Sequence, residues 1–226
     1  MISSIVDKFK NVLESISSDA AAAYEQNMGV LTEHVNRTLE ERDDFRDLIG
    51  QNPIEVMRDN HANHAQFMLS QFRLKSAHAM VETIVWVYRT YISRGFSARY
   101  FPIELTAWMD AMDSRMDPSS AQEIKAVYSL MMDEHTTFLQ LSQSTRKTPS
   151  VSEDIVPYFE KYKKAVLKPD LNEAIQVTSE FVRDSQKIPL WWEQIIAPAM
   201  QEIGRLWEEG EITVGQEHLA TSITQR

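Results

Sequence analysis

Apolar residues recur every three or four positions along most of the chain, which is the spacing of one face of an α-helix. In the first 50 residues this pattern begins at Ile5 and Phe9 and extends to Leu39, with a candidate break at Gly29. We expect residues 1–50 to form a helical arm with one polar face. The arm either packs as a lid on the rest of the chain or serves as a dimerisation helix, so a homodimer is one expected assembly.

The same periodicity continues through a second segment, which we expect to form an N-terminal helical domain over 51–143. Turn-forming residues interrupt it twice, and prolines suit the first turns of two of its helices. The expected elements are helical periodicity within 54–87, a helix from Pro102, a helix from Pro118 to Leu141, and turns at 50–53 and 94–97.

Residues 144–153 are rich in hydroxyl side chains and poor in apolar ones, which is typical of an exposed linker. After it, four helices with short connections are expected over 154–226, the pattern of a small antiparallel bundle. They run from Ile155 to Leu167, from Asp170 to Val182, from Pro189 to Trp207 with Pro198 inside, and from Val214 to the end, the last opened by a capping box of Thr213 and Gln216. The expected fold class is all-α.

Composition argues against several classes of function. The 226 residues include 33 acidic and 23 basic side chains, a formal charge of −10 that disfavours direct binding of nucleic acid. Six scattered glycines form no phosphate-binding loop, and the absence of cysteine excludes disulfides and thiolate metal sites. The first residues lack the basic and apolar pattern of a signal peptide, and no apolar run is long enough to span a membrane, so we expect a cytoplasmic protein. The sequence contains no E-x-x-H motif, so we expect no dimetal carboxylate site and no metal site of its own.

The densest cluster of unusual residues lies in the last predicted hairpin. Trp207 closes one helix, and Val214, Glu217, His218 and Thr221 share a face of the next because they are spaced three or four apart. One interpretation is structural, with a core tryptophan, a carboxylate favoured by the helix N-terminus and a satisfied histidine. The other is a binding site.

The sequence of residues 195–221 favours the binding site, because this stretch resembles the helical cap module of cobalamin-binding proteins. The pattern P-x-M-x-x-I-G-x-x-W-x-x-G-x-I-x-V-x-x-E-H is present from Pro198 to His218, and it includes the W-x9-E-H signature of the light-sensing cobalamin regulators. The resemblance covers roughly residues 153–226, about a third of the chain.

That resemblance implies a site for cobalamin, with adenosylcobalamin the expected form. Trp207 would cover the upper face of the corrin ring, Glu217 would accept hydrogen bonds from ribose hydroxyls, and His218 would orient Glu217. The expected cofactor-binding residues are Met200, Ile203, Trp207, Val214, Glu217, His218 and Thr221. One departure is Glu208, which stands where a branch of the family has a histidine that captures cobalt.

In the family, an α/β domain with the motif D-x-H-x-x-G follows the cap and supplies the lower cobalt ligand. We therefore expect this chain to be a piece of a longer protein, with that domain as a partner after Arg226. Without that domain, the affinity for cobalamin should be weak or absent.

A more diffuse resemblance concerns the N-terminal domain, which is similar to the helical region of cobalamin photoreceptors that also hold a bilin. It implies a biliverdin site, for which the chain offers histidine and arginine partners for the propionate groups and aromatic side chains for the walls. Alternatively the tryptophans are core residues and the histidines are surface or helix-packing groups. The candidates are His61, His64, Trp86, Arg89, Tyr91 and Trp108.

Taken together, these features predict a cobalamin-dependent light-sensing regulatory protein, not an enzyme. Its cap would cover the upper face of the cofactor and transmit changes of the upper ligand to the neighbouring helical domain. Two alternatives stay open: a corrinoid shuttle protein of a methyltransferase system, and a helical interaction module without a cofactor.

Overall fold

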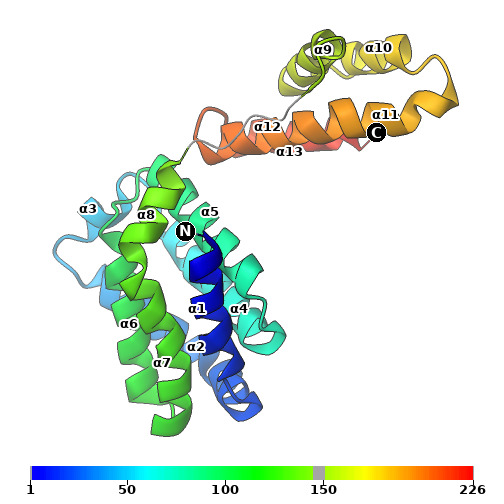
Figure 1. The fold of residues 1–226 in the computed structure, drawn as a ribbon. Helices are drawn as coiled ribbons and strands as arrows, with labels where there is room; N and C mark the ends of the chain where they lie inside the picture. Colours follow the sequence, from blue (N-terminus) through cyan, green and yellow to red (C-terminus); the bar gives the residue numbers. More distant parts are fainter. Residues whose placement is uncertain (1, 145–150, 226) are drawn as a thin grey trace. The chain divides into compact units, whose positions relative to one another are not determined.

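The computed structural model describes residues 2–144 and 151–225, and every regular element in these ranges is helical (Figure 1). The chain divides into two compact units, Met1–Ser144 and Thr145–Arg226. Most of the linker expected over 144–153 lies outside the described residues. No helix in the described ranges is long and apolar enough to cross a lipid bilayer.

The N-terminal unit is built around α2, which packs against α4, α6 and α7, while α1 packs against α5 and α7. Phe9 and Tyr24, from the segment expected to form an arm, are fully buried in the same core as Trp108. The helices are α1 (Ile2–Glu14), α2 (Ser18–Glu40), α3 (Phe45–Ile49), α4 (Ile54–Leu74), α5 (Ala77–Ser93), α6 (Tyr100–Arg115), α7 (Pro118–Asp133) and α8 (His135–Gln143).

Three helix boundaries in this unit differ from the expected ones. The first break falls before α2, where the Ser17 side chain accepts a hydrogen bond from the Ala20 N–H, and Gly29 lies inside α2. The periodic run over 54–87 is divided at Lys75, which adopts a left-handed backbone with φ of 56°. The run from Pro118 divides at Glu134. Apolar spacing persists across all three breaks because the helices on both sides face the same core.

The two predicted turns at 50–53 and 94–97 are confirmed, and they lie against each other. The Asn52 side chain donates to the Arg94 carbonyl at 2.8 Å, and the Ser97 N–H donates to the Leu48 carbonyl at 2.9 Å. Gly50 has a φ of 61°, and a Cβ there would stand 2.6 Å from the Gly95 oxygen. Only glycine satisfies both the backbone angle and this close approach.

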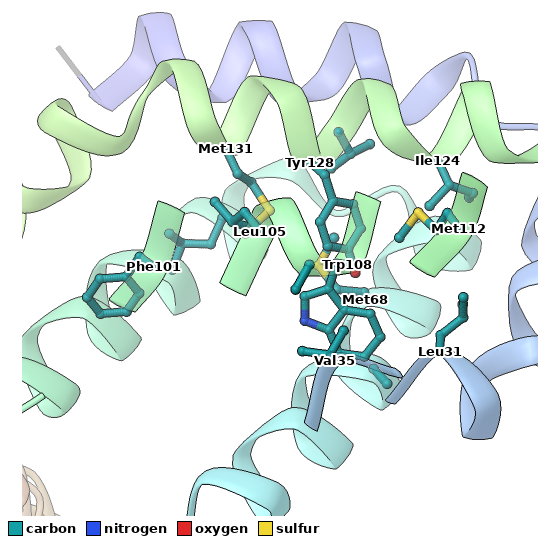
Figure 2. Close-up of a cluster of buried hydrophobic side chains, with 14 of the residues drawn as sticks. Leu31, Val35, Met68, Phe101, Leu105, Trp108, Met112, Ile124, Tyr128 and Met131 are labelled. Atoms are coloured by element: carbon teal, nitrogen blue, oxygen red, sulfur yellow. The ribbon is translucent and has the colours of Figure 1, made fainter. Parts of the chain in front are cut away.

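Aromatic side chains provide the largest buried groups in the core of the N-terminal unit. Figure 2 shows the Trp108 indole beneath the Tyr128 ring, with Met68 and Val35 close to it. The largest side chains that are fully buried include Trp108, Tyr24, Tyr100, Tyr128, Phe9, Phe72 and Phe138. Three of these carry hydroxyl groups, which need hydrogen-bond partners inside the core.

The C-terminal unit contains the four helical segments that the sequence predicts. Its core joins α9 to the third and fourth segments through residues such as Tyr162, Ile195, Ile203 and Ala220. The elements are α9 (Val156–Leu167), α10 (Leu171–Phe181), a 3-10 turn η1 (Ser185–Lys187), α11 (Ile188–Trp191), a π-helical segment η2 (Trp192–Ile196), α12 (Ala197–Glu208) and α13 (Val214–Thr224). The all-α fold class is confirmed.

The third segment was expected as one regular helix but contains the π-helical turn η2. Pro198 has no N–H and cannot donate to the carbonyl four residues before it. Directly before this proline, the Ala197 N–H donates to the Trp192 carbonyl, five residues back. The wider turn lets the helix continue past the proline, and such insertions are frequent at functional sites.

The predicted capping box of α13 is present, and we expect its removal to weaken the helix. The Thr213 hydroxyl accepts from the Gln216 N–H at 3.3 Å, and the Gln216 side chain accepts from the Thr213 N–H at 2.9 Å. Thr213→Ala should lower the free energy of unfolding by about 1 kcal/mol, measured by denaturant titration. Ser222→Ala, at an exposed position on the same helix, is the control. An equal loss in the two variants would argue against the cap.

Candidate functional site

The candidate site lies on the hairpin of α12 and α13. Gly210 ends α12 with a φ of 75°, and the Glu211 N–H returns to the Leu206 carbonyl at 2.8 Å. This left-handed turn closes the helix as a C-terminal glycine does. Thr213 then opens α13, so the connection is only a few residues long and the start of α13 is held next to the end of α12.

Glu217 is the centre of a small hydrogen-bonded group on the first turns of α13. Its Oε2 lies 2.7 Å from Nδ1 of His218, and its Oε1 accepts from the Thr221 hydroxyl at 2.9 Å. The Glu217 side chain is half-buried, whereas that of His218 is 73% exposed. The predicted face of α13 therefore presents the Glu217 carboxylate, which His218 and Thr221 orient and which is open to solvent on one side. Val214 lies at its N-terminal edge and is 51% exposed.

The residues expected from α12 differ in accessibility. Trp207 and Met200 are half-buried, and Ile203 is fully buried in the core. Ile203 thus packs the hairpin from inside. The Met200 sulfur lies 3.4 Å from the Thr224 hydroxyl, which ties α12 to the last turn of α13. Glu208, which directly follows Trp207, is buried, with 7% exposure.

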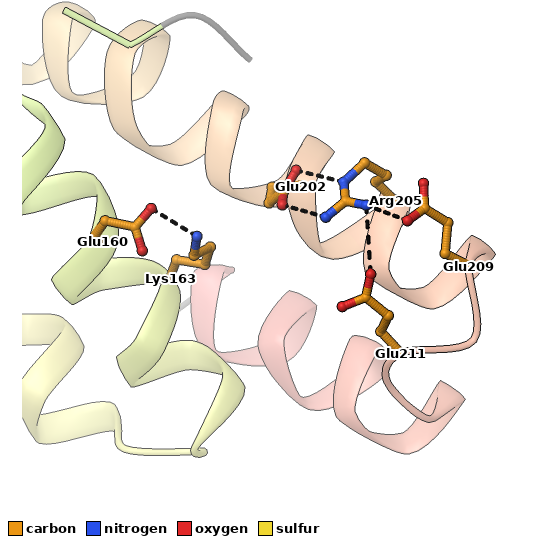
Figure 3. Close-up of polar contacts among 6 residues, drawn as sticks. All are labelled: Glu160, Lys163, Glu202, Arg205, Glu209 and Glu211. Atoms are coloured by element: carbon orange, nitrogen blue, oxygen red, sulfur yellow. Dashed lines mark hydrogen bonds and ion pairs between the residues drawn. The ribbon is translucent and has the colours of Figure 1, made fainter. Parts of the chain in front are cut away.

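Arg205 fastens the end of α12 to the loop before α13 (Figure 3). Its guanidinium donates two hydrogen bonds to Glu202, at 2.7 and 2.9 Å, and also pairs with Glu209 and with Glu211, the latter at 3.7 Å. Hydrogen bonds from Arg205 hold the pKa of the Glu202 carboxyl below its usual value, and Glu202 holds the pKa of Arg205 above its own. The cluster was not predicted, although its three- and four-residue spacing is visible in the sequence.

Exposed apolar side chains are concentrated in the C-terminal unit. Among the described residues, the larger N-terminal unit exposes four large apolar side chains and the smaller C-terminal unit exposes seven. The seven are Val156, Ile175, Ile188, Leu190, Trp192, Val214 and Leu219. Val214 lies about one turn before Glu217 on the same face of α13, whereas Leu219 lies on the opposite side of that helix.

Four of the six bilin candidates come together in the N-terminal unit. His61, His64 and Trp108 meet in the core, where the His64 and Trp108 rings stack with centroids 5.2 Å apart. Tyr91 joins this group through Tyr100, whose ring lies 6.0 Å away. His61 and Trp108 are fully buried, as the alternative of core tryptophans expects for Trp108.

The other two bilin candidates, Trp86 and Arg89, lie on α5. Trp86 is half-buried, and Arg89 donates to the Ser142 carbonyl at 3.0 Å. The structure therefore brings His61, His64, Trp108 and Tyr91 together in the core. Biliverdin binding stays a prediction, and a shift of the visible absorption band on adding biliverdin is its test.

Residues 158–226 match the family model described as a B12 binding domain. The match lies within the C-terminal unit and includes the whole α12–α13 hairpin, so it supports a cobalamin-binding helical cap and a corrinoid as its ligand. A search of curated proteins and a search of solved structures each found no match.

Proposed function

We propose that the C-terminal unit covers the upper face of adenosylcobalamin and that the chain is a light-sensing regulatory protein. The observation that carries this proposal is the hydrogen bonding of the Glu217 carboxylate. Each of its oxygens already accepts one hydrogen bond, from Thr221 and His218. An ionised carboxylate has about four acceptor positions, so about two are left for a ligand.

Those remaining positions fit a vicinal diol such as that of the adenosyl ribose. Two hydroxyl donors side by side match the two oxygens of one carboxylate, and bonds to an ionised acceptor are stronger than neutral ones. Thr221 and His218 reduce the number of orientations that the carboxylate samples, which lowers the entropic cost of binding. His218 and Thr221 are thus positioning residues for Glu217.

The surroundings of this carboxylate fit the rest of the cofactor. A corrin is a broad, mostly apolar ring with polar groups at its edge, and Val214 and the half-buried Trp207 offer apolar contact on the same hairpin. The bound cofactor would supply a cobalt–carbon bond that light cleaves. We propose that Trp207 shields the upper ligand. Loss of this ligand would change the packing of the hairpin, and this change would be transmitted to the N-terminal helical unit.

The enzymatic alternative is a corrinoid shuttle, which would carry a methyl group as the upper ligand. A methyl group has no hydroxyl donors for the free acceptor positions of Glu217. The alternatives therefore differ in one measurable quantity: a sensor of this type prefers adenosylcobalamin to methylcobalamin, and Glu217→Gln should remove that preference. Equal binding of both cobalamins by the unchanged protein would favour the shuttle.

Trp207→Ala tests the light response. The full-length protein is loaded with adenosylcobalamin in darkness and illuminated, and the change of the cofactor's absorption spectrum with time is followed. Removing an indole contact worth about 1.4 kcal/mol should speed loss of the upper ligand about tenfold. Trp192→Ala, which removes an exposed indole of the same unit, is the matched control. An unchanged rate in Trp207→Ala would mean that Trp207 is only structural.

A further inference from the structure

The core of the N-terminal unit contains a buried carboxyl group that the cobalamin proposal does not use. Glu104 lies on α6, one turn after Tyr100 and one turn before Trp108, so the three side chains share a face of that helix. The residue is 7% exposed. Its Oε1 accepts from the Trp108 indole N–H at 3.2 Å.

A histidine from α4 lies beside this carboxyl in a defined tautomer. Nδ1 of His61 is 2.6 Å from the amide oxygen of Asn36, which only accepts, so Nδ1 carries the proton. Nε2 then accepts from the Tyr100 hydroxyl at 2.7 Å. That same Nε2 is 3.9 Å from Oε1 of Glu104, but as an unprotonated nitrogen it offers the carboxyl neither a proton nor a positive charge.

The remaining groups around the carboxyl are also neutral. His64 bonds to the Tyr128 hydroxyl at 3.0 Å, and Tyr128 to Tyr24 at 3.2 Å. Among the described residues, no lysine or arginine forms an ion pair with Glu104. The facing groups are Tyr24 and Asn36 of α2, His61 and His64 of α4, Tyr88 and Tyr91 of α5, Tyr100 and Trp108 of α6, and Tyr128 of α7, with His135 of α8 behind Tyr88.

We propose that Glu104 is a proton-linked switch in the N-terminal unit: its protonated carboxyl keeps α2, α4 and α6 packed, and loss of the proton loosens them. A carboxylate at this position has one N–H donor and no cation, so its charge is poorly compensated in the apolar core. The protonated form carries no charge and can itself donate a hydrogen bond. The switch needs no cofactor and is independent of the cobalamin proposal.

Charge and burial place the switch near neutral pH. Burial raises the pKa of Glu104 from 4.5 to about 7, against the hydrogen bond from Trp108, which lowers it. Burial lowers the pKa of His61 to about 3, with a contribution from His64, and lowers the pKa of His64 to about 4. Both histidines are therefore neutral in the folded state wherever Glu104 titrates.

The sign of the pH dependence follows from proton counts. Since the folded pKa of Glu104 is raised, its stabilising contribution is complete below about pH 4.5, declines as the pH rises, and is lost above about pH 7. The lowered pKa values of His61 and His64 act oppositely, because the unfolded chain binds protons there below about pH 6.5. Glu104 thus controls the alkaline side of the stability maximum.

Glu104→Gln tests the switch in the full chain without cofactor. Glutamine keeps the shape of the protonated carboxyl and its acceptor for Trp108, so the variant is expected to fold. Its melting temperature relative to the unchanged protein should rise by about 5 °C between pH 5 and pH 8.5. Glu82→Gln, at an exposed carboxyl on α5, should show no such change. A difference between Glu104→Gln and the unchanged protein that is constant with pH would overturn the proposal.

Two further readouts separate titration from a merely structural effect. The unchanged protein should show an infrared band of a protonated carboxyl at pH 6 that disappears above pH 8, and Glu104→Gln should lack it. Amide hydrogen exchange in α4 and α6, compared at the same pH, should be faster in the unchanged protein than in Glu104→Gln at pH 8.5. Absence of the band at pH 6 would contradict the switch.

Discussion

Trp191→Ala is expected to lower the free energy of unfolding of the C-terminal unit by about 3–5 kcal/mol, the cost of deleting a large buried aromatic side chain. Trp191 is 4% exposed, and its ring packs against Tyr162 and Phe181, with centroids 5.2 and 5.4 Å away. These contacts join α11 to α9 and α10. A domain of this size has about 5–15 kcal/mol of stability in all, so the variant should lose much of its cooperative unfolding transition.

Trp192 provides the matched control because it has the same side chain one position later. It is 58% exposed, so Trp192→Ala should change the free energy of unfolding by no more than about 0.5 kcal/mol. Denaturant titration followed by circular dichroism measures both variants. If Trp192→Ala proved the more damaging, α11 and η2 would have to be rotated about the helix axis from the arrangement described.

Arg205→Met is expected to cost about 3 kcal/mol at neutral pH, because it leaves the Glu202 carboxylate buried without its cation. The Glu202 side chain is only 8% exposed and takes two of the guanidinium's hydrogen bonds. Methionine preserves the apolar length of the side chain, so the loss reports the charge pair. The same change releases Glu211 and with it one tie between α12 and the loop before α13.

The deficit of Arg205→Met should depend on pH in a defined direction. The folded pKa of Glu202 is lowered by Arg205, so the pair contributes stability above about pH 4.5 and loses it as the pH falls. The difference between Arg205→Met and the unchanged protein should therefore shrink in acid. Glu160→Gln, which removes the exposed pair with Lys163 seen in Figure 3, should cost less than about 1 kcal/mol at any pH. Equal losses from the two changes would refute the buried pair.

Helix positions in this chain are largely predictable from sequence, whereas helix ends are less so. The capping box of Thr213 and the stop at Gly210 are local signals and are correctly read. The breaks at Ser17 and Lys75 are not predicted, because apolar spacing continues across both of them. The N-cap at Ser17 is a local signal hidden within that spacing, whereas the left-handed turn at Lys75 has no glycine to mark it. The π-helical turn before Pro198 follows from the missing N–H of that proline.

The two candidate sites differ in how much of them the sequence reveals. The Glu217 group comes from one helix, so residue spacing alone brings Thr221 within reach of the carboxylate. The Glu104 cluster draws on α2, α4 and α6, and His61 and Asn36 are 25 positions apart. Sequence singles out His61 and Trp108 but not the carboxyl between them, because contacts between distant helices leave no periodic signal.

Titration of the isotope-labelled chain with adenosylcobalamin in darkness, followed by nuclear magnetic resonance, tests the central claim most directly. The method detects binding even if it is weak. If the C-terminal unit covers a corrinoid, the indole N–H of Trp207 and the amides of Val214, Glu217 and Thr221 should shift together and saturably, while the N-terminal amides around Glu104 stay in place. No shift in the α12–α13 hairpin at millimolar cobalamin, or shifts confined to the N-terminal unit, would contradict the claim.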